Sequence, residues 1–99
     1  MAQTPEAKVK AAVRAILAEH GVYYFSPASN GYGRVGIPDI VCCVQGKFLA
    51  IECKAGKGQL TTLQAREIAN INAAWGITLV INETNTHEVR TTLERLCHA

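Results

Sequence analysis

The sequence lacks the patterns that identify several large classes of protein. None of its four cysteines belongs to a C-x-x-C pair or stands at zinc-ligand spacing from a histidine. No stretch approaches the roughly 18 apolar residues of a membrane-spanning helix, and the N-terminus has no apolar segment typical of a secretion signal. The net charge is only +2, so neither sign of charge dominates. We therefore expect a cytoplasmic protein with reduced cysteines and no membrane contact.

The composition is that of one folded domain. Hydrophobic residues make up 48% and charged residues 18% of the 99 residues, which is far from a disordered profile. A chain of this length buries roughly two-thirds of its unfolded surface, enough for one core. Cys42, Cys43 and Cys53 lie in apolar runs, where a free cysteine behaves as a small core residue, so we expect buried thiols. We predict a single domain over residues 1–99.

The hydrophobic pattern predicts the element order αβββαβα. Thr4 and Pro5 suit the start of the first helix, and its basic residues Lys8, Lys10 and Arg14 lie mostly off the apolar stripe. Glycines and prolines mark residues 26–38 as a long loop. The predicted helices are 5–20, 63–75 and one capped by Asn85 or Thr86, and the predicted strands are 22–25, 39–44, 48–53 and 77–81.

The two middle strands form a hairpin that brings carboxylates together. Both strands are apolar on both faces, so we expect them inside the sheet and covered on each side. A turn centred on Gln45-Gly46 pairs Asp39 with Glu52, with Cβ atoms about 4.5–5.5 Å apart. Lys54 projects from the same face as Glu52 because a strand has a period of two residues.

This carboxylate pair predicts a metal site. Two charges about 5 Å apart repel each other by an amount on the order of 3 kcal/mol at an effective dielectric constant of 20. A divalent cation such as Mg²⁺ would offset the repulsion, with Asp39, Glu52 and the Cys53 backbone carbonyl as ligands. Lys54 would then orient or deprotonate the attacking water and neutralise phosphate charge. The competing interpretation is a surface ion pair between Glu52 and Lys54, with Asp39 merely starting a strand.

The elements Gly36-x-Pro38-Asp39 and Glu52-x-Lys54, with Gln64 opening the next helix, resemble the VRR-Nuc (virus-type replication–repair nuclease) family of the PD-(D/E)xK superfamily. The resemblance covers nearly the whole chain. It implies a restriction-endonuclease-like α/β fold, with an αβββαβ core of a mixed sheet flanked by helices and an extra C-terminal helix. It also implies Mg²⁺- or Mn²⁺-dependent phosphodiester hydrolysis on branched or flapped DNA, and a homodimer. Members occur as stand-alone phage proteins, which act in the cytoplasm of the host bacterium, and as the nuclease domain of the Fanconi-associated repair nuclease.

Two helical residues are further candidates for the catalytic site. Glu6 lies in line with Val9, and family members carry an acidic residue on this helix that assists metal or water binding. A carboxylate is also favoured at any helix N-terminus, which leaves both interpretations open. Gln64 lies in line with Trp75 on the expected inward face, and the family carries a glutamine here. The alternative is a capping box formed by Thr61 and Gln64.

The loops around the hairpin supply candidate DNA contacts. Asn30, Tyr32 and Arg34 lie in the loop that leads into the hairpin, and Lys57 lies in the loop that follows it. Such side chains commonly bind backbone phosphates. They are equally compatible with solvated loops. No base-reading motif is present, so we expect recognition of DNA shape.

We therefore predict a metal-dependent, structure-selective DNA endonuclease that cuts four-way junctions or flaps. A restriction-type, sequence-specific endonuclease is an alternative, although 99 residues leave little room for a target-recognition element. A second alternative is a non-catalytic DNA-binding or assembly module that kept the fold, against which stands the complete Asp-Glu-Lys set. A metal-binding stress protein without nuclease activity has no positive feature in its favour.

Overall fold

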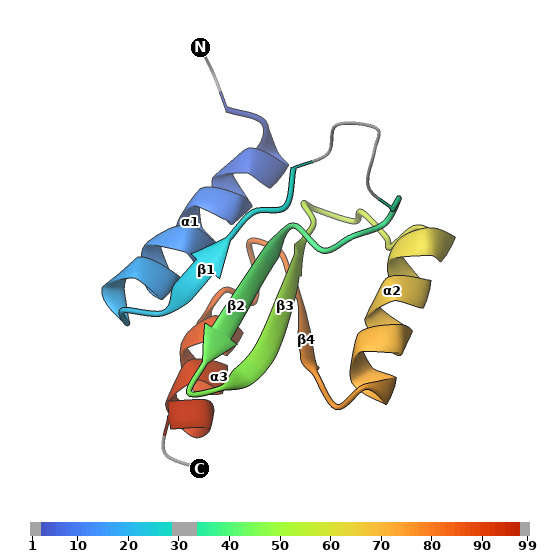
Figure 1. The fold of residues 1–99 in the computed structure, drawn as a ribbon. Helices are drawn as coiled ribbons and strands as arrows, with labels where there is room; N and C mark the ends of the chain where they lie inside the picture. The colour runs from blue at the N-terminus through green and yellow to red at the C-terminus, as the bar shows by residue number, and fades with distance from the viewer. Residues whose placement is uncertain (1–2, 29–33, 98–99) are drawn as a thin grey trace.

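The computed structural model describes residues 3–28 and 34–97, which form three helices and four strands (Figure 1). The predicted order αβββαβα is confirmed. The bounds are α1 Pro5–Glu19, β1 Tyr23–Phe25, β2 Ile40–Val44, β3 Lys47–Cys53, α2 Thr62–Ala73, β4 Ile77–Ile81 and α3 His87–Cys97. None of these helices has the length and apolarity needed to cross a bilayer.

The four strands form one mixed sheet in the order β1-β2-β3-β4. The first three strands are antiparallel neighbours, and β4 runs parallel to β3 after the crossover through α2. A two-residue turn joins β2 to β3, with φ values of 53° at Gln45 and 80° at Gly46, as hairpin turns of type I′ require. Ile40 pairs with Ile51, which is the predicted register.

Helices α1 and α3 cover one face of the sheet and build the core there (Figure 1). Every second residue of β2 and β3 points into this core, because successive side chains of a strand alternate between faces. The buried residues come from both helices and from the sheet: Val9, Val13, Ile16, Leu17, Ile40, Cys42, Val44, Leu49, Ile51, Cys53, Ile81, Val89, Leu93 and Leu96.

The opposite face of the sheet is only partly covered. Helix α2 lies over it near β4, where the Thr78 hydroxyl donates to Asn72 at 3.0 Å, and α2 contains no buried residue. Cys43 and Phe48, paired across β2 and β3, remain exposed. The prediction that the hairpin is covered on both sides is therefore wrong for the Cys43–Phe48 end of this face, whereas Ala50 and Glu52 farther along β3 are buried. The prediction of a buried Cys43 thiol is also wrong. Cys42 and Cys53 are buried as expected.

Helix α2 ends earlier than predicted, and Trp75 does not face inward. The chain leaves the helix in a Schellman motif, in which the Trp75 N–H donates to Asn72 O at 3.0 Å and the Gly76 N–H donates to Ile71 O at 2.9 Å. Trp75 takes the left-handed conformation with φ 70°, and its side chain is 94% exposed. A Cβ at Gly76 would lie 2.6 Å from Ile71 Cγ2, so close packing holds the turn in place.

The segment before β2 is anchored on the start of α2 at Gly36. This residue has φ +90°, and a Cβ there would lie 2.7 Å from both the C and O atoms of Leu63. Arg34 reinforces the contact through an ion pair with Glu67 at 3.2 Å. The backbone that leads into Asp39 is therefore held by the first turns of α2.

We expect Gly36→Ala to destabilise the protein by roughly 2–3 kcal/mol, because it combines a left-handed backbone with a clash against the backbone of α2. Gly46→Ala is the matched control, since Gly46 also has a positive φ but has nothing within 4 Å of an added Cβ. Its loss should be about 1 kcal/mol. Urea denaturation of both variants measures the difference, and equal losses would contradict the tight contact at Gly36.

Candidate active site

Asp39 and Glu52 meet at the end of the hairpin opposite its turn. Asp39 directly precedes β2, and its Oδ2 atom accepts the Cys53 backbone N–H at 2.8 Å. This bond continues the ladder of β2 and β3 by one side chain beyond the Ile40–Ile51 pair. The hairpin therefore brings the Asp39 carboxylate next to Glu52, as the predicted register requires.

Glu52 is a buried carboxyl group with an unsatisfied oxygen. Its side chain belongs to a residue that is only 3% exposed, and among the described residues Oε2 has no hydrogen-bond partner. Burial, together with the hydrogen bond and negative charge of Asp39, raises the pKa of Glu52 to about 8 against the opposing charge of Lys54. Glu52 therefore retains its proton in the metal-free protein at neutral pH.

Asp39 titrates in the opposite direction. Burial favours a higher pKa for Asp39, but the hydrogen bonds from Glu52 and the Cys53 N–H, together with Lys10, hold the pKa below its ordinary value of 3.8. The pKa values of the two neighbouring carboxyl groups are thus shifted in opposite directions, so that Asp39 is ionised and Glu52 is protonated. Such a separation is typical of functional carboxyl pairs.

Lys54 lies at the end of β3 on the same side as Glu52. Its backbone N–H donates to Ile81 O at 2.9 Å, which extends the pairing with β4 past Cys53 and preserves the strand alternation. The ammonium charge acts on Glu52 by lowering its pKa. The structure therefore brings Asp39, Glu52 and Lys54 to one end of the sheet.

Helix α1 contributes Glu6 and a residue that the sequence analysis missed, Lys10. The Lys10 ammonium lies 3.3 Å from Asp39 Oδ1 and 4.0 Å from Glu6 Oε2. The charge of Glu6 also reaches Glu52, whose pKa it raises. The i, i+4 spacing of Glu6 and Lys10 would have pointed to Lys10 once Glu6 was placed in the site.

Gln64 forms the capping box that was the alternative interpretation. Its Oε1 atom accepts the Thr61 N–H at 2.9 Å, and Thr61 Oγ1 accepts the Gln64 N–H at 3.1 Å. These bonds satisfy the start of α2 next to the Gly36 contact. A catalytic role for Gln64 remains a prediction.

The structure describes only two of the residues predicted to contact DNA, and these two differ in whether they are already paired. Arg34 is 78% exposed but engaged with Glu67. Lys57 is exposed in the loop after β3, where the neighbouring Gly56 N–H donates to Glu83 at 2.8 Å. Asn30 and Tyr32 lie outside the described residues.

The donors fit a hard, oxygen-seeking cation. Among the described residues there is no group of three or more His, Cys, Asp or Glu side chains arranged to hold a metal ion. The ligands available here are instead oxygen atoms of two carboxyl groups: the unsatisfied Oε2 of buried Glu52 and the side chain of Asp39. Mg²⁺ is commonly bound by one or two carboxylates, with waters and substrate phosphates as the other ligands. Main-chain oxygen from Cys53, water and phosphate would complete such a site.

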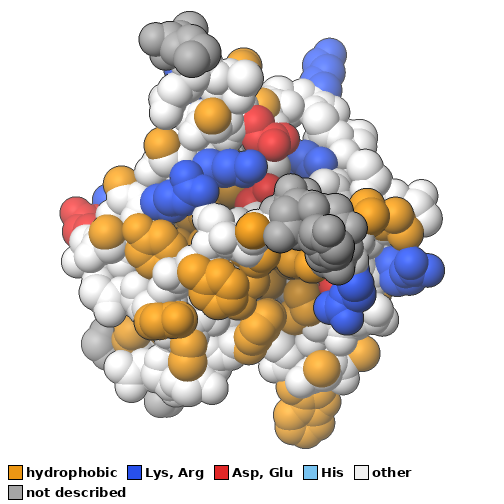
Figure 2. Space-filling view, turned by 45° about the horizontal axis from the view of Figure 1, so that its top comes forward, with side chains coloured by type: hydrophobic (Ala, Val, Ile, Leu, Met, Phe, Trp, Pro, Cys, Tyr) orange, Lys and Arg blue, Asp and Glu red, His pale blue; other side chains and the backbone are white. Residues whose placement is uncertain are grey.

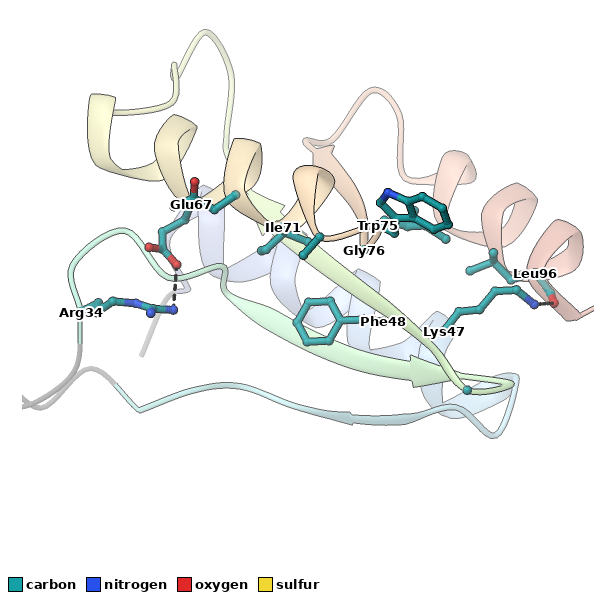
Figure 3. Close-up of a pocket in the computed structure, with 12 residues that line it drawn as sticks. Arg34, Lys47, Phe48, Glu67, Ile71, Trp75, Gly76 and Leu96 are labelled. Atoms are coloured by element: carbon teal, nitrogen blue, oxygen red, sulfur yellow. Dashed lines mark hydrogen bonds and ion pairs between the residues drawn. The ribbon is translucent and has the colours of Figure 1, made fainter.

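A separate pocket lies at the other end of the hairpin. Its volume is about 870 Å³, and it is lined by Gly46 of the turn and Lys47 of β3 and, on the facing side, by Ile71 and Trp75 (Figure 3). Neither Asp39 nor Glu52 lines it. The pocket is therefore distinct from the carboxylate site.

Comparison with protein-family models identifies the family of the chain. Residues 7–75 match the family model "Archaeal holliday junction resolvase (hjc)", a family of the PD-(D/E)xK nuclease superfamily. No curated protein matches the chain. The matched region runs from α1 to just beyond α2 and contains Asp39, Glu52, Lys54 and Lys10, but not Glu6. The superfamily and the restriction-endonuclease-like fold expected from the sequence are confirmed.

The metal-free protein should lose stability as the pH rises. Because the pKa of folded Glu52, about 8, exceeds its ordinary value of 4.5, its contribution is fully present below 4.5 and is lost as the pH rises through about 8. Asp39 has a lowered pKa, so its contribution is lost only on acidification below 3.8. Between about pH 5 and 8 the free energy of unfolding should fall, by at most about 1.4 kcal/mol per pH unit.

Urea denaturation in EDTA across this range measures the slope. Glu52→Gln should flatten it, whereas the exposed Glu94→Gln should leave it unchanged. A wild-type stability that stays level from about pH 5 to 8 would contradict a protonated Glu52.

Proposed function

Because the chain belongs to the archaeal Holliday junction resolvase family of PD-(D/E)xK nucleases, we propose that it is a metal-dependent endonuclease that cuts branched DNA, above all the four-way junction. The observation that carries the proposal is the pairing of ionised Asp39 with buried Glu52 across the hairpin, beside Lys54. Membership of a nuclease family supports hydrolysis. The metal requirement and the choice of DNA structure are the parts that the proposal adds.

Each site residue would have its own role in hydrolysis. Asp39, Glu52 and the Cys53 carbonyl would hold the cation, with Glu6 assisting through water. Bound Mg²⁺ or Mn²⁺ would lower the pKa of a water molecule and offset negative charge on the scissile phosphate. Lys54, next to Glu52, would orient the attacking water and stabilise the charge that develops on the phosphate oxygens.

The surface around the site supports binding through the DNA backbone. Figure 2 shows Lys and Arg side chains beside acidic ones, above a broad hydrophobic region of the same face. Exposed Lys57 and the partly exposed Lys10 would contact phosphates, while Arg34 would have to exchange Glu67 for a phosphate. Phosphate contacts fix position without reading sequence, which suits selection by DNA shape.

We also propose kinship with the VRR-Nuc branch of the superfamily, on the pattern Gly36-x-Pro38-Asp39, Glu52-x-Lys54 and Gln64. A phage or prophage origin is part of this proposal, because the stand-alone members of that branch are phage proteins. Such an origin would place the enzyme in the bacterial cytoplasm during replication or repair.

A symmetric homodimer is the proposed working form, because resolving a junction needs two cuts and each chain offers one site. The incompletely covered sheet face supports this proposal. Tyr23, Cys43 and Phe48 form one row across three strands, all exposed, and α2 has no buried residue. Trp75 lies beside the pocket that Phe48 also lines (Figure 3). Closed twofold assemblies are the commonest oligomers and would match the symmetry of a junction.

The purified protein should cut a four-way junction in Mg²⁺ or Mn²⁺ at least roughly tenfold faster than linear duplex, because recognition depends on DNA shape. Asp39→Asn and Glu52→Gln should each reduce cleavage by roughly 100-fold or more, since each removes a cation ligand. Both variants should remain folded in the absence of metal.

Glu94→Gln, a change of the same kind on the exposed surface of α3, is the control and should cut normally. Circular dichroism confirms folding of each variant. Cleavage that persists in excess EDTA, or full activity of either folded site variant, would sink the proposed mechanism.

For the dimer, light scattering should give a mass close to twice 10.7 kDa. Trp75 is the single tryptophan, so its emission should shift to shorter wavelengths as concentration rises and the partner covers it. Trp75→Glu should weaken association, because it places a charge in an apolar interface. Ala15→Glu introduces the same charge on exposed α1 and should leave the dimer intact. A mass near 10.7 kDa at working concentrations would rule the dimer out.

A further inference from the structure

Lys10 occupies the free oxygen of Asp39. The Asp39 Oδ2 atom already accepts the Cys53 N–H at 2.8 Å, which leaves Oδ1 as the oxygen that accepts no backbone hydrogen bond. The Lys10 ammonium lies 3.3 Å from that Oδ1 atom. A positive charge of the protein itself thus stands at the atom that the proposed metal site requires.

The position of Lys10 follows from the packing of α1. Val9 and Val13 are buried in the core and anchor the helix, so Lys10 projects from its edge over the start of β2. Its side chain is 30% exposed and also approaches Glu6, at 4.0 Å. Lys10 therefore bridges a carboxylate of α1 and a carboxylate of the hairpin.

Each of the two lysines of the site acts on a different one of its two carboxyl groups. Lys54 acts on Glu52, whereas Lys10 contacts Asp39 directly. Lysine suits a temporary contact, because its ammonium is a compact point charge on a flexible four-carbon stem. An arriving divalent cation and the Lys10 ammonium carry the same sign, so both cannot share Oδ1 without strong repulsion.

We propose that Lys10 is a built-in counter-ion of the metal site, which holds Asp39 and Glu6 in the metal-free protein and is displaced by the incoming divalent cation. The displaced ammonium then turns outward to a DNA phosphate beside the scissile bond. Lys10 is thus a positioning residue before metal binds and a phosphate contact afterwards. The inference rests on the proposed function, because it presupposes the metal site at Asp39 and Glu52.

Direct Mn²⁺ binding without DNA tests the displacement, with free Mn²⁺ measured by electron paramagnetic resonance. Lys10→Met keeps the length of the side chain but removes its charge, so Mn²⁺ should bind roughly tenfold more tightly than to the wild type. Lys8→Met is the matched control on the same helix: Lys8 is exposed and takes part in none of the ion pairs between described residues. Its affinity for Mn²⁺ should stay within about twofold of the wild type.

Lys10→Arg retains the charge and should bind Mn²⁺ like the wild type. Lys10→Gln removes the charge but keeps a polar side chain, should bind Mn²⁺ as tightly as Lys10→Met, and takes its place if Lys10→Met does not fold without metal. With a four-way junction, Lys10→Met should reduce the salt dependence of binding by about one counter-ion. Mn²⁺ binding by Lys10→Met that is weaker than, or equal to, that of Lys8→Met would overturn the proposal, as would an equal gain in Lys10→Arg.

These outcomes are distinct from failure of the proposed nuclease function. If the wild type binds Mn²⁺ and the two methionine variants bind it equally, only the role of Lys10 is lost. If neither the wild type nor Lys10→Met binds Mn²⁺ or cleaves DNA, the metal site itself is lost, and the role of Lys10 with it.

Discussion

A single hydrogen bond, from the Cys53 N–H to Asp39 Oδ2, joins the chemistry of this protein to its fold. It orients Asp39 toward Glu52, directs Oδ1 toward α1, and closes the end of the hairpin. The bond forms only because β2 and β3 are in the register in which Ile40 pairs with Ile51. The core, the sheet and the loop anchored at Gly36 all serve to keep this register in place.

The site is also built around an electrostatic conflict. Two carboxyl groups meet where one of them, Glu52, is buried among apolar strand residues. The protein lessens the conflict by retaining a proton on Glu52 and by placing Lys10 against Asp39. A divalent cation would replace both devices at once, so the arrangement supports the proposed metal-dependent hydrolysis over a purely structural ion pair.

Much of this architecture could be predicted from the sequence, because its causes are local. The turn at Gln45-Gly46 determines the strand register, and the apolar run 77–81 coincides with β4. The predictions that were wrong concern features that depend on tertiary packing. An apolar residue such as Cys43 does not reveal whether its face of the sheet is covered. Helical periodicity alone predicts that α2 extends as far as Trp75. The reach of Lys10 to Asp39 depends on where the edge of α1 lies over the hairpin.

The type I′ turn restricts how this protein can change over evolutionary time. Inserting or deleting one residue at Gln45-Gly46 would shift β2 against β3 by one position and exchange the faces of every side chain on one strand. Asp39 would then point away from Glu52, although the turn lies at the far end of the hairpin. Loop tips usually tolerate length variation, but here the length of a remote surface turn determines whether the candidate site residues Asp39 and Glu52 meet.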